Sequence, residues 1–201
     1  MKLLGRGWQY SAYDIGGGRV RKVLNSRALS YYMMLHDSFP YTVNPPWKYK
    51  AFYERSKKEA ITSARIIKET SLPLWMFGNP VYVGALDYEQ DLAEPLHKVF
   101  SRVDIEEGKK IIDEFVLFNK TLIEHSVVDR GFAIATNFSL NNEKKVILTD
   151  VGELYDDPAR IGELILTRPW SEAHVLRHLP PPLQQYFTHA KLFLTKNTSR
   201  G

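Results

Sequence analysis

Two short apolar runs that flank a polar turn constrain this chain more than any other feature. Phe138 and Leu140 precede the turn sequence Asn-Asn-Glu-Lys, and the apolar run Val146–Leu148 follows it. This order predicts two short strands joined by a turn. Asn137 stands just before the first strand and Asp150 just after the second, so an amide oxygen and a carboxylate should project from neighbouring strand ends. Oxygen ligands of this kind suit Mg²⁺, which completes its shell with water and phosphate oxygens.

The residues around Asp150 resemble the metal-binding motifs of the protein-kinase-like superfamily. Asn137, followed by Leu148-Thr149-Asp150-Val151-Gly152, is similar in order to the catalytic-loop Asn and the Asp-Phe-Gly motif of that family. The resemblance implies that Asn137 and Asp150 hold Mg²⁺ against the phosphates of ATP. The alternative for Asn137 is a turn or strand-end residue that bonds its own backbone.

The amino terminus resembles the same family. Gly5 and Gly7 match a glycine-rich loop whose third glycine is replaced by Tyr10, and glycine lets backbone N–H groups approach phosphate oxygens closely. Lys22, after the Gly16–Gly18 turn, stands where the family places its phosphate-contacting lysine. The alternatives are an ordinary turn for the glycine pair and a solvated strand lysine for Lys22.

Glu59 lies in a stretch that resembles the helix supplying the carboxylate partner of that lysine. In the helix predicted over residues 51–69, Glu59 and Ser63 share one stripe with apolar residues, which directs the Glu59 carboxylate to an inward or half-buried face. The resemblance implies that Glu59 pairs with Lys22. The alternative is a pair with Arg55 at helical spacing, an arrangement that contributes little stability on a surface.

The chain departs from the family pattern at the catalytic Asp. In the family, this Asp precedes the metal-binding Asn by one short loop and accepts the proton of the attacking hydroxyl. The equivalent position here is Phe132, and a phenyl ring cannot take up a proton. The nearest upstream carboxylate is Asp129, and Gly131 allows the loop to fold back. Asp129 is therefore the candidate catalytic base, and Lys22 is the second candidate catalytic residue.

Two functions from different classes follow from the resemblance. The first is an ATP- and Mg²⁺-dependent phosphotransferase that acts on a small molecule or a protein. The second is a pseudokinase, a nucleotide-binding or regulatory module without turnover. Small PhoP-regulated kinase-like proteins of bacteria are similar in size and in lacking the usual catalytic Asp. A third hypothesis is a phage or bacterial interaction protein whose aromatic segment 29–50 contacts a partner.

Composition excludes several other classes. The 201-residue chain has no cysteine, so disulfides, thiolate metal sites and a Cys nucleophile are excluded. The formal charge of +4 is mild and its cations are scattered, so no nucleic-acid partner is expected. No window approaches the roughly 18–20 apolar residues of a membrane span, and we expect a cytoplasmic protein. His174 and His178 lack a third ligand at zinc spacing.

Periodicity and turn signals predict an α+β protein, and the resemblance implies a two-lobed kinase-like architecture. Residues 1–87 form the expected N-terminal lobe, which contains the glycine-rich loop. It begins with three strands over residues 2–24 and continues through the aromatic insert 29–50. The insert is too rich in proline to be one helix. A further strand is expected over residues 80–85.

Residues 88–201 form the expected helical C-terminal lobe, which carries the metal-binding hairpin. The resemblance implies that residues 88–91 are the hinge between the lobes. The clearest helix spans residues 105–125, with apolar residues at helical spacing and acids in its first turn. Further helices are predicted over residues 157–167 and after Pro180–Pro182.

Overall fold

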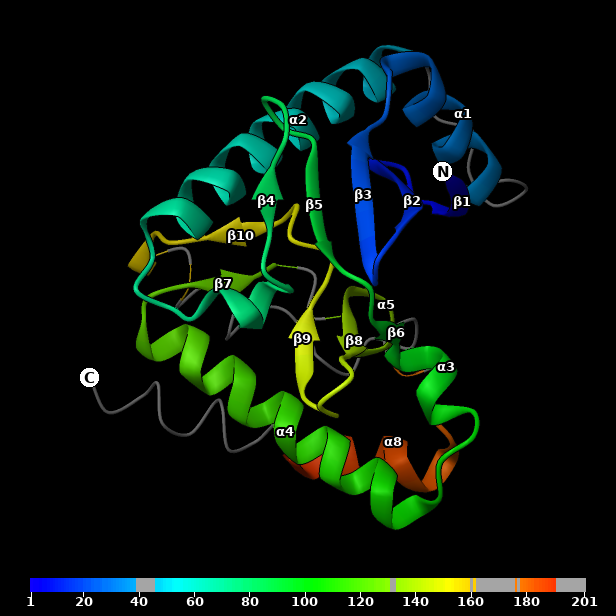
Figure 1. The fold of residues 1–201 in the computed structure, drawn as a ribbon, viewed down its shortest axis with the longest axis vertical. Coiled ribbons are helices and arrows are strands. Elements are labelled where there is room, and N and C mark those ends of the chain that lie inside the picture. The colour runs from blue at the N-terminus through cyan, green and yellow to red at the C-terminus, as the bar shows by residue number, and fades with distance from the viewer. Residues whose placement is uncertain (39–45, 131–132, 160, 162–175, 177, 191–201) are drawn as a thin grey trace.

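The computed structural model describes residues 1–38, 46–130, 133–159, 161, 176 and 178–190. Within these ranges the chain is an α+β protein. A β-sheet and two helices form the N-terminal region, and further helices, a three-stranded sheet of β6, β8 and β9, and one strand pair form the rest (Figure 1). None of the helices in these ranges combines the length and the apolar character that a bilayer span requires.

Five strands form the N-terminal sheet in the described part of the chain. They pair antiparallel in the order β1-β2-β3-β5-β4 (Figure 1). Their bounds are β1 Lys2–Arg6, β2 Tyr10–Gly16, β3 Arg19–Leu24, β4 Val81–Tyr82 and β5 Tyr88–Asp91. The three strands predicted over residues 2–24 are confirmed, and the strand predicted over 80–85 is shorter than expected.

Three consecutive glycines close the turn between β2 and β3. Gly16, Gly17 and Gly18 have φ angles of 83°, 61° and 71°. These values lie in the left-handed region, where a residue with a Cβ is strained. The backbone itself therefore requires glycine at this turn.

The side chains of β3 alternate between the two faces of the sheet. Arg19 and Arg21 form ion pairs with carboxylates of β5 across the outer face. Val20 and Lys22 point to the opposite face, because successive strand residues alternate in direction. Lys22 therefore projects with Val20 and not with the solvated arginines.

Two helices cover most of residues 29–50, the segment expected to be an aromatic insert. Helix α1 spans Arg27–Ser38 and α2 spans Pro46–Glu69. Helix α2 begins five residues earlier than predicted because proline is well tolerated in a first helical turn. Its predicted inward stripe is confirmed, since Glu59 and Ser63 are buried.

The residues expected as a hinge form strand β5. Tyr88 and Gln90 are buried, whereas Glu89 forms an ion pair with β3 on the other face, and this alternation is typical of a strand. The division expected between residues 87 and 88 thus falls between two paired strands of the sheet. After Asp91 the chain continues through Leu92 and Ala93 into β6, Glu94–Pro95, and α3, Leu96–Phe100. The short helix η1, Leu74–Phe77, precedes β4.

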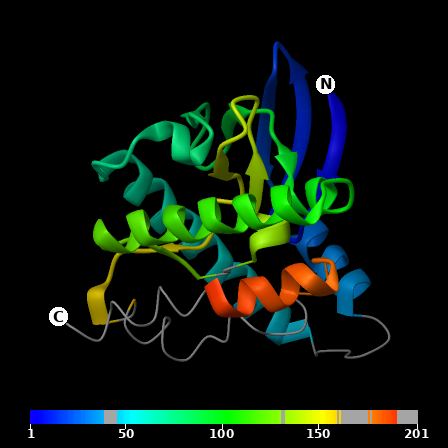
Figure 2. The same ribbon diagram turned by 90° about the horizontal axis from the view of Figure 1, so that it is seen from below.

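Helix α4, Ile105–Glu124, matches the helix predicted over residues 105–125. Asp104 caps it by accepting a hydrogen bond from the Glu107 N–H at 2.8 Å. Its apolar face packs against α8, Pro181–Ala190, which lies beside it (Figure 2). The helix after the prolines is therefore confirmed, whereas most of the helix predicted over 157–167 lies outside the described residues.

The predicted hairpin is confirmed. Strand β8, Phe138–Leu140, pairs antiparallel with β9, Val146–Leu148, and helix α5, Ile134–Asn137, directly precedes β8. The Phe138 ring packs edge-on against Phe115 of α4, with ring centroids 4.7 Å apart. A second strand pair joins β7, Val128–Asp129, to β10, Leu154–Tyr155.

Gly108 tests the packing of α4 against α8. A Cβ at this position would lie 2.4 Å from the Cδ1 atom of Leu183, which is buried. Alanine favours a helix by about 1 kcal/mol over glycine, but overpacking a core costs about 1–3 kcal/mol. We therefore expect Gly108→Ala to lower the free energy of unfolding, measured by urea denaturation. The loss should disappear when Leu183→Ala is the background, and a more stable Gly108→Ala single variant would contradict this packing.

Candidate functional site

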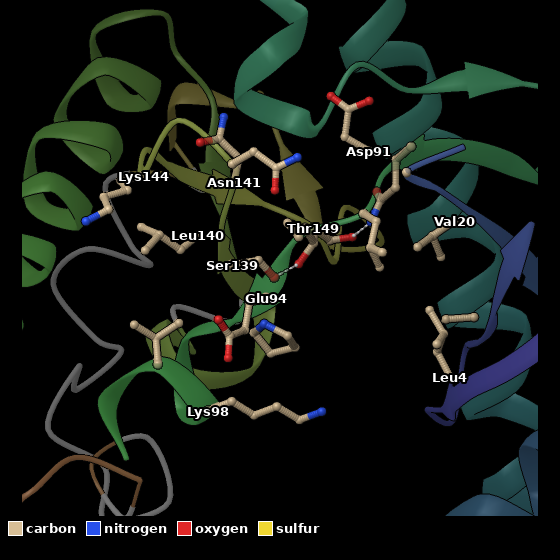
Figure 3. A pocket seen from close by; sticks show the side chains of 18 of the residues that line it. Leu4, Val20, Asp91, Glu94, Lys98, Ser139, Leu140, Asn141, Lys144 and Thr149 are labelled. Carbon is tan, nitrogen blue, oxygen red and sulfur yellow. Dashed lines mark hydrogen bonds between the residues drawn. The ribbon is translucent and has the colours of Figure 1, made fainter. Parts of the chain in front are cut away.

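A cavity of about 730 Å³ lies between the N-terminal sheet and the β8–β9 hairpin. This volume is in the range of ligand pockets. Leu4 and Val20 line it on the sheet side, and Leu140 and Thr149 line it on the hairpin side (Figure 3). Residues from distant parts of the sequence therefore face one another across a single space.

Lys22 lines this cavity from β3. Its cross-strand neighbours are Ala12 of β2 and Tyr88 of β5, and it makes no ion pair within the described part of the chain. Lys98 of α3 extends into the same cavity, and Lys144 lies at its edge (Figure 3). The lining also includes the carboxylates of Asp91, Glu94 and Glu107, so the cavity presents charges of both signs.

Asn137 and Asp150 meet at the open end of the hairpin. The backbone oxygen of Asn137 accepts hydrogen bonds from the N–H groups of Thr149 and Asp150, at 2.9 and 3.0 Å. The Thr149 hydroxyl lies 3.2 Å from the same oxygen and 2.8 Å from the Ser139 hydroxyl. These bonds fix the backbone of Asp150 beside Asn137, as the predicted strand pairing requires.

Asp129 lies next to this pair. Its side chain is completely buried, and its Oδ2 atom accepts a long hydrogen bond of 3.5 Å from the Asn137 side-chain amide. Strand β7 holds it in place by pairing Asp129 with Leu154 of β10. The structure therefore brings together Asp129, Asn137 and Asp150.

Asp150 also lies near the face of the sheet that carries Lys22. Burial raises the pKa of Tyr88 well above its ordinary value, and the negative charge of Asp150 raises it further. The pKa of Tyr10 is raised by the same two causes in the same order. Tyr88 is the cross-strand neighbour of Lys22. Lys22, the candidate phosphate-binding group, and Asp150, a candidate metal ligand, therefore both lie near the buried Tyr88.

The structure does not bring Glu59 to Lys22. Glu59 Oε1 lies 2.9 Å from the Arg130 guanidinium and accepts a hydrogen bond of 2.8 Å from the Tyr155 hydroxyl. Arg55, at helical spacing, lies 3.9 Å away. A buried carboxylate requires a close cation, and Arg130 is the one that meets it here.

Arg130 also binds Glu153 through the second arm of its guanidinium. The Arg130, Glu59 and Glu153 side chains are only 12%, 8% and 17% exposed. Burial raises the pKa of Glu153, and the hydrogen bond from Arg130 opposes that rise. The sequence analysis assigns no role to Arg130 or Glu153. The signal that could have found Arg130 was the inward-facing Glu59, because a buried carboxylate requires a cation as its partner.

Gly5 and Gly7 have no left-handed φ angle. A Cβ at Gly5 would meet nothing within 4 Å, and one at Gly7 would have only the Tyr10 carbonyl oxygen, at 3.7 Å, as a close neighbour. The chain's own packing therefore does not require glycine at either position. Gly5 borders the cavity, so the space beside it is open to a ligand.

Several sequence-derived candidates lie outside the described residues, among them Gly131, Phe132 and His174. The His178 ring packs near His97, with centroids 5.9 Å apart. Across the described ranges, no group of three or more His, Cys, Asp or Glu side chains is arranged to hold a metal ion. Asn137 and Asp150 lie outside the lining of the cavity, and a divalent ion beside them would need further ligand oxygens.

Comparison with known proteins gives distant structural likenesses. No protein-family model matches the chain, and no curated protein matches it. Two solved structures of the bifunctional kinase-methyltransferase WbdD are similar, one of them a co-crystal with the kinase inhibitor LY294002. Their TM-scores are 0.45 and 0.46 at 13% and 12% identity, over 96% and 100% of this chain. The chain spans 45% and 48% of those structures, and likenesses this distant assign it neither activity nor ligand.

Arg130→Met tests the buried charge cluster. The substitution leaves Glu59 and Glu153 buried without their cation, so we expect a loss of about 3–5 kcal/mol in the free energy of unfolding. Arg102→Met is the matched control, because Arg102 pairs with Glu94 on the surface, where the side chains are 60% and 40% exposed; it should cost about 0–1 kcal/mol. Urea denaturation measures both, and equal losses would contradict a structural role for the Arg130 cluster.

Proposed function

We propose that this chain has a two-lobed kinase-like fold and transfers the γ-phosphoryl group of ATP to a small-molecule or protein acceptor. One observation carries the proposal: Lys22 from the sheet and Thr149, the residue before Asp150, line the same cavity. Lys22 thereby borders a space of nucleotide size, and Asp150 lies one residue beyond its lining residue Thr149. Phosphoryl transfer needs mainly positioning and charge neutralisation.

The walls of the cavity suit the base of a nucleotide. Leu4, Ala12 and Val20 supply apolar surface from three strands of the sheet, and Leu140 supplies it from the hairpin. A flat aromatic base between such surfaces buries apolar area on both of its faces. We therefore assign the base to this part of the cavity, and the phosphates to the part beside Lys22.

The polar end of the cavity suits a triphosphate and Mg²⁺. Lys22 makes no ion pair in the described chain and is available to phosphate oxygens, and the open space beside Gly5 allows close backbone approach. Asn137 and Asp150 supply oxygen ligands of the type that Mg²⁺ uses together with phosphate and water. Mg²⁺, when bound, neutralises charge on the phosphates. Glu59, the residue expected to pair with Lys22, bonds Arg130 instead.

Asp129 is the proposed base in this phosphotransferase. Its carboxylate touches the Asn137 side chain, so it lies beside the proposed metal ligands. One observation favours the alternative, a pseudokinase that binds nucleotide as a regulatory module: Asp129 is 0% exposed, and a base must reach the hydroxyl from which it takes a proton.

Asp150→Ala tests the proposed metal site. Wild-type protein with ATP at about 100 times its dissociation constant should be stabilised by about 2.7 kcal/mol, and the Mg²⁺-dependent part of that gain should vanish in the variant. The apo fold should keep its melting temperature, because Asp150 forms no ion pair in the described chain. Asp156→Ala, which removes an exposed carboxylate paired with Arg65, is the matched control. A variant that responds to Mg²⁺ and ATP like wild type would show the assignment to be wrong.

Asp129→Asn separates the two functions. If Asp129 is the base, turnover should fall by about 10² to 10⁴ while the dissociation constant for ATP stays unchanged. Asparagine keeps the size of the side chain but cannot take up the proton. Steady-state turnover and ATP titration are measured on the same preparations. A wild-type protein that binds ATP but transfers no γ-phosphoryl group to any supplied acceptor would favour the pseudokinase.

A further inference from the structure

Gln9 is a buried polar residue in the turn between β1 and β2. It is 6% exposed, and its Nε2 atom donates a hydrogen bond of 3.0 Å to the backbone oxygen of Ser56 in α2. Turns normally direct polar side chains to water. The inward direction of this side chain therefore ties the turn to a helix distant in the sequence.

The Gln9 amide also lies directly on Gly152. A Cβ at position 152 would be 1.8 Å from the Gln9 Oε1 atom, which is far closer than van der Waals contact. Gly152 does not have a left-handed φ angle, so the backbone conformation does not require glycine there. The contact with Gln9 is what excludes a side chain.

The turn that carries Gln9 is fixed by further contacts. The Asn25 backbone N–H donates to the backbone oxygen of Gln9 at 2.9 Å, and the Asn25 side-chain amide donates to the backbone oxygen of Gly7 at 2.8 Å. The Trp8 ring packs edge-on against Phe52 of α2, with centroids 4.9 Å apart. These contacts hold the backbone of the turn, and the bond to Ser56 holds the Gln9 side-chain amide.

We propose that Gln9 is a positioning residue for Asp150. Gly152 follows Asp150 by two residues, so the contact of the Gln9 side chain with Gly152 restricts the position of the backbone around Asp150. The same side chain connects this turn to α2, and Gln9 follows the Gly5–Gly7 segment in the chain. Gln9 therefore couples Mg²⁺ binding at Asp150 to nucleotide binding in the cavity, and this inference rests on the proposed function.

The test is the coupling between Mg²⁺ and ATP, measured by titrating the full chain with ATP in the presence and absence of Mg²⁺. Gln9→Ala should reduce the Mg²⁺-dependent gain in ATP affinity by about tenfold, within the usual range of coupling between two sites. ATP affinity without Mg²⁺ should stay nearly constant. Gln184→Ala is the matched control, because its amide also donates to a backbone oxygen, that of Leu179, at 2.8 Å, but from α8.

Gln9→Met keeps the volume of the side chain and removes its hydrogen-bond donor, so it serves if the alanine variant fails to fold. It too should reduce the coupling. Gly152→Ala should also reduce the coupling, and the double variant Gln9→Ala/Gly152→Ala should fall no further than Gln9→Ala alone, because the clash is gone. A purely structural role would lower the melting temperature and leave the coupling intact.

Two outcomes overturn the inference in distinguishable ways. If wild-type protein couples Mg²⁺ to ATP and folded Gln9 variants couple them equally well, Gln9 does not position Asp150. If wild-type protein binds no ATP with or without Mg²⁺, the proposed function fails, and this inference fails with it.

Discussion

The buried guanidinium of Arg130 is the interaction on which the rest of the structure depends most. Charges leave water at a high cost unless each meets an opposite charge, and Arg130 meets Glu59 of α2 and Glu153 of the segment before β10. Arg130 directly follows Asp129, and Glu153 directly follows Gly152. The same charge pairing therefore joins a helix of the N-terminal region to both segments that carry the candidate site.

Around this cluster, backbone hydrogen bonding determines where the site residues lie. The Asn137 carbonyl oxygen accepts hydrogen bonds from the N–H groups of both Thr149 and Asp150. This closure aligns the ends of β8 and β9, and β7 brings Asp129 alongside. Asp129, Asn137 and Asp150 thus converge because the backbone groups at the strand ends bond one another.

Elements with a strong local pattern were predictable from sequence. The β8–β9 hairpin, α4 and the first three strands follow from period and turn residues, and alternation assigned Lys22 to the face it shares with Val20. Pairings between distant segments have no local signal in the sequence. Three features of this kind could not be predicted: the pairing of Glu59 with Arg130, the pairing of strand 88–91 with β3, and the contact of Gln9 with Gly152. The start of α2 differs from the prediction because the first turn of a helix accepts proline.

The contact between Gln9 and Gly152 has a consequence for how sequences related to this one can vary. Glycine at position 152 is required by a side chain from the opposite end of the chain, so the two positions are not independent. A relative with a side chain at the position of Gly152 should carry a residue shorter than glutamine at the position of Gln9. Correlated substitution of these two positions would then record the docking of the β1–β2 turn, even where neither residue contacts a ligand.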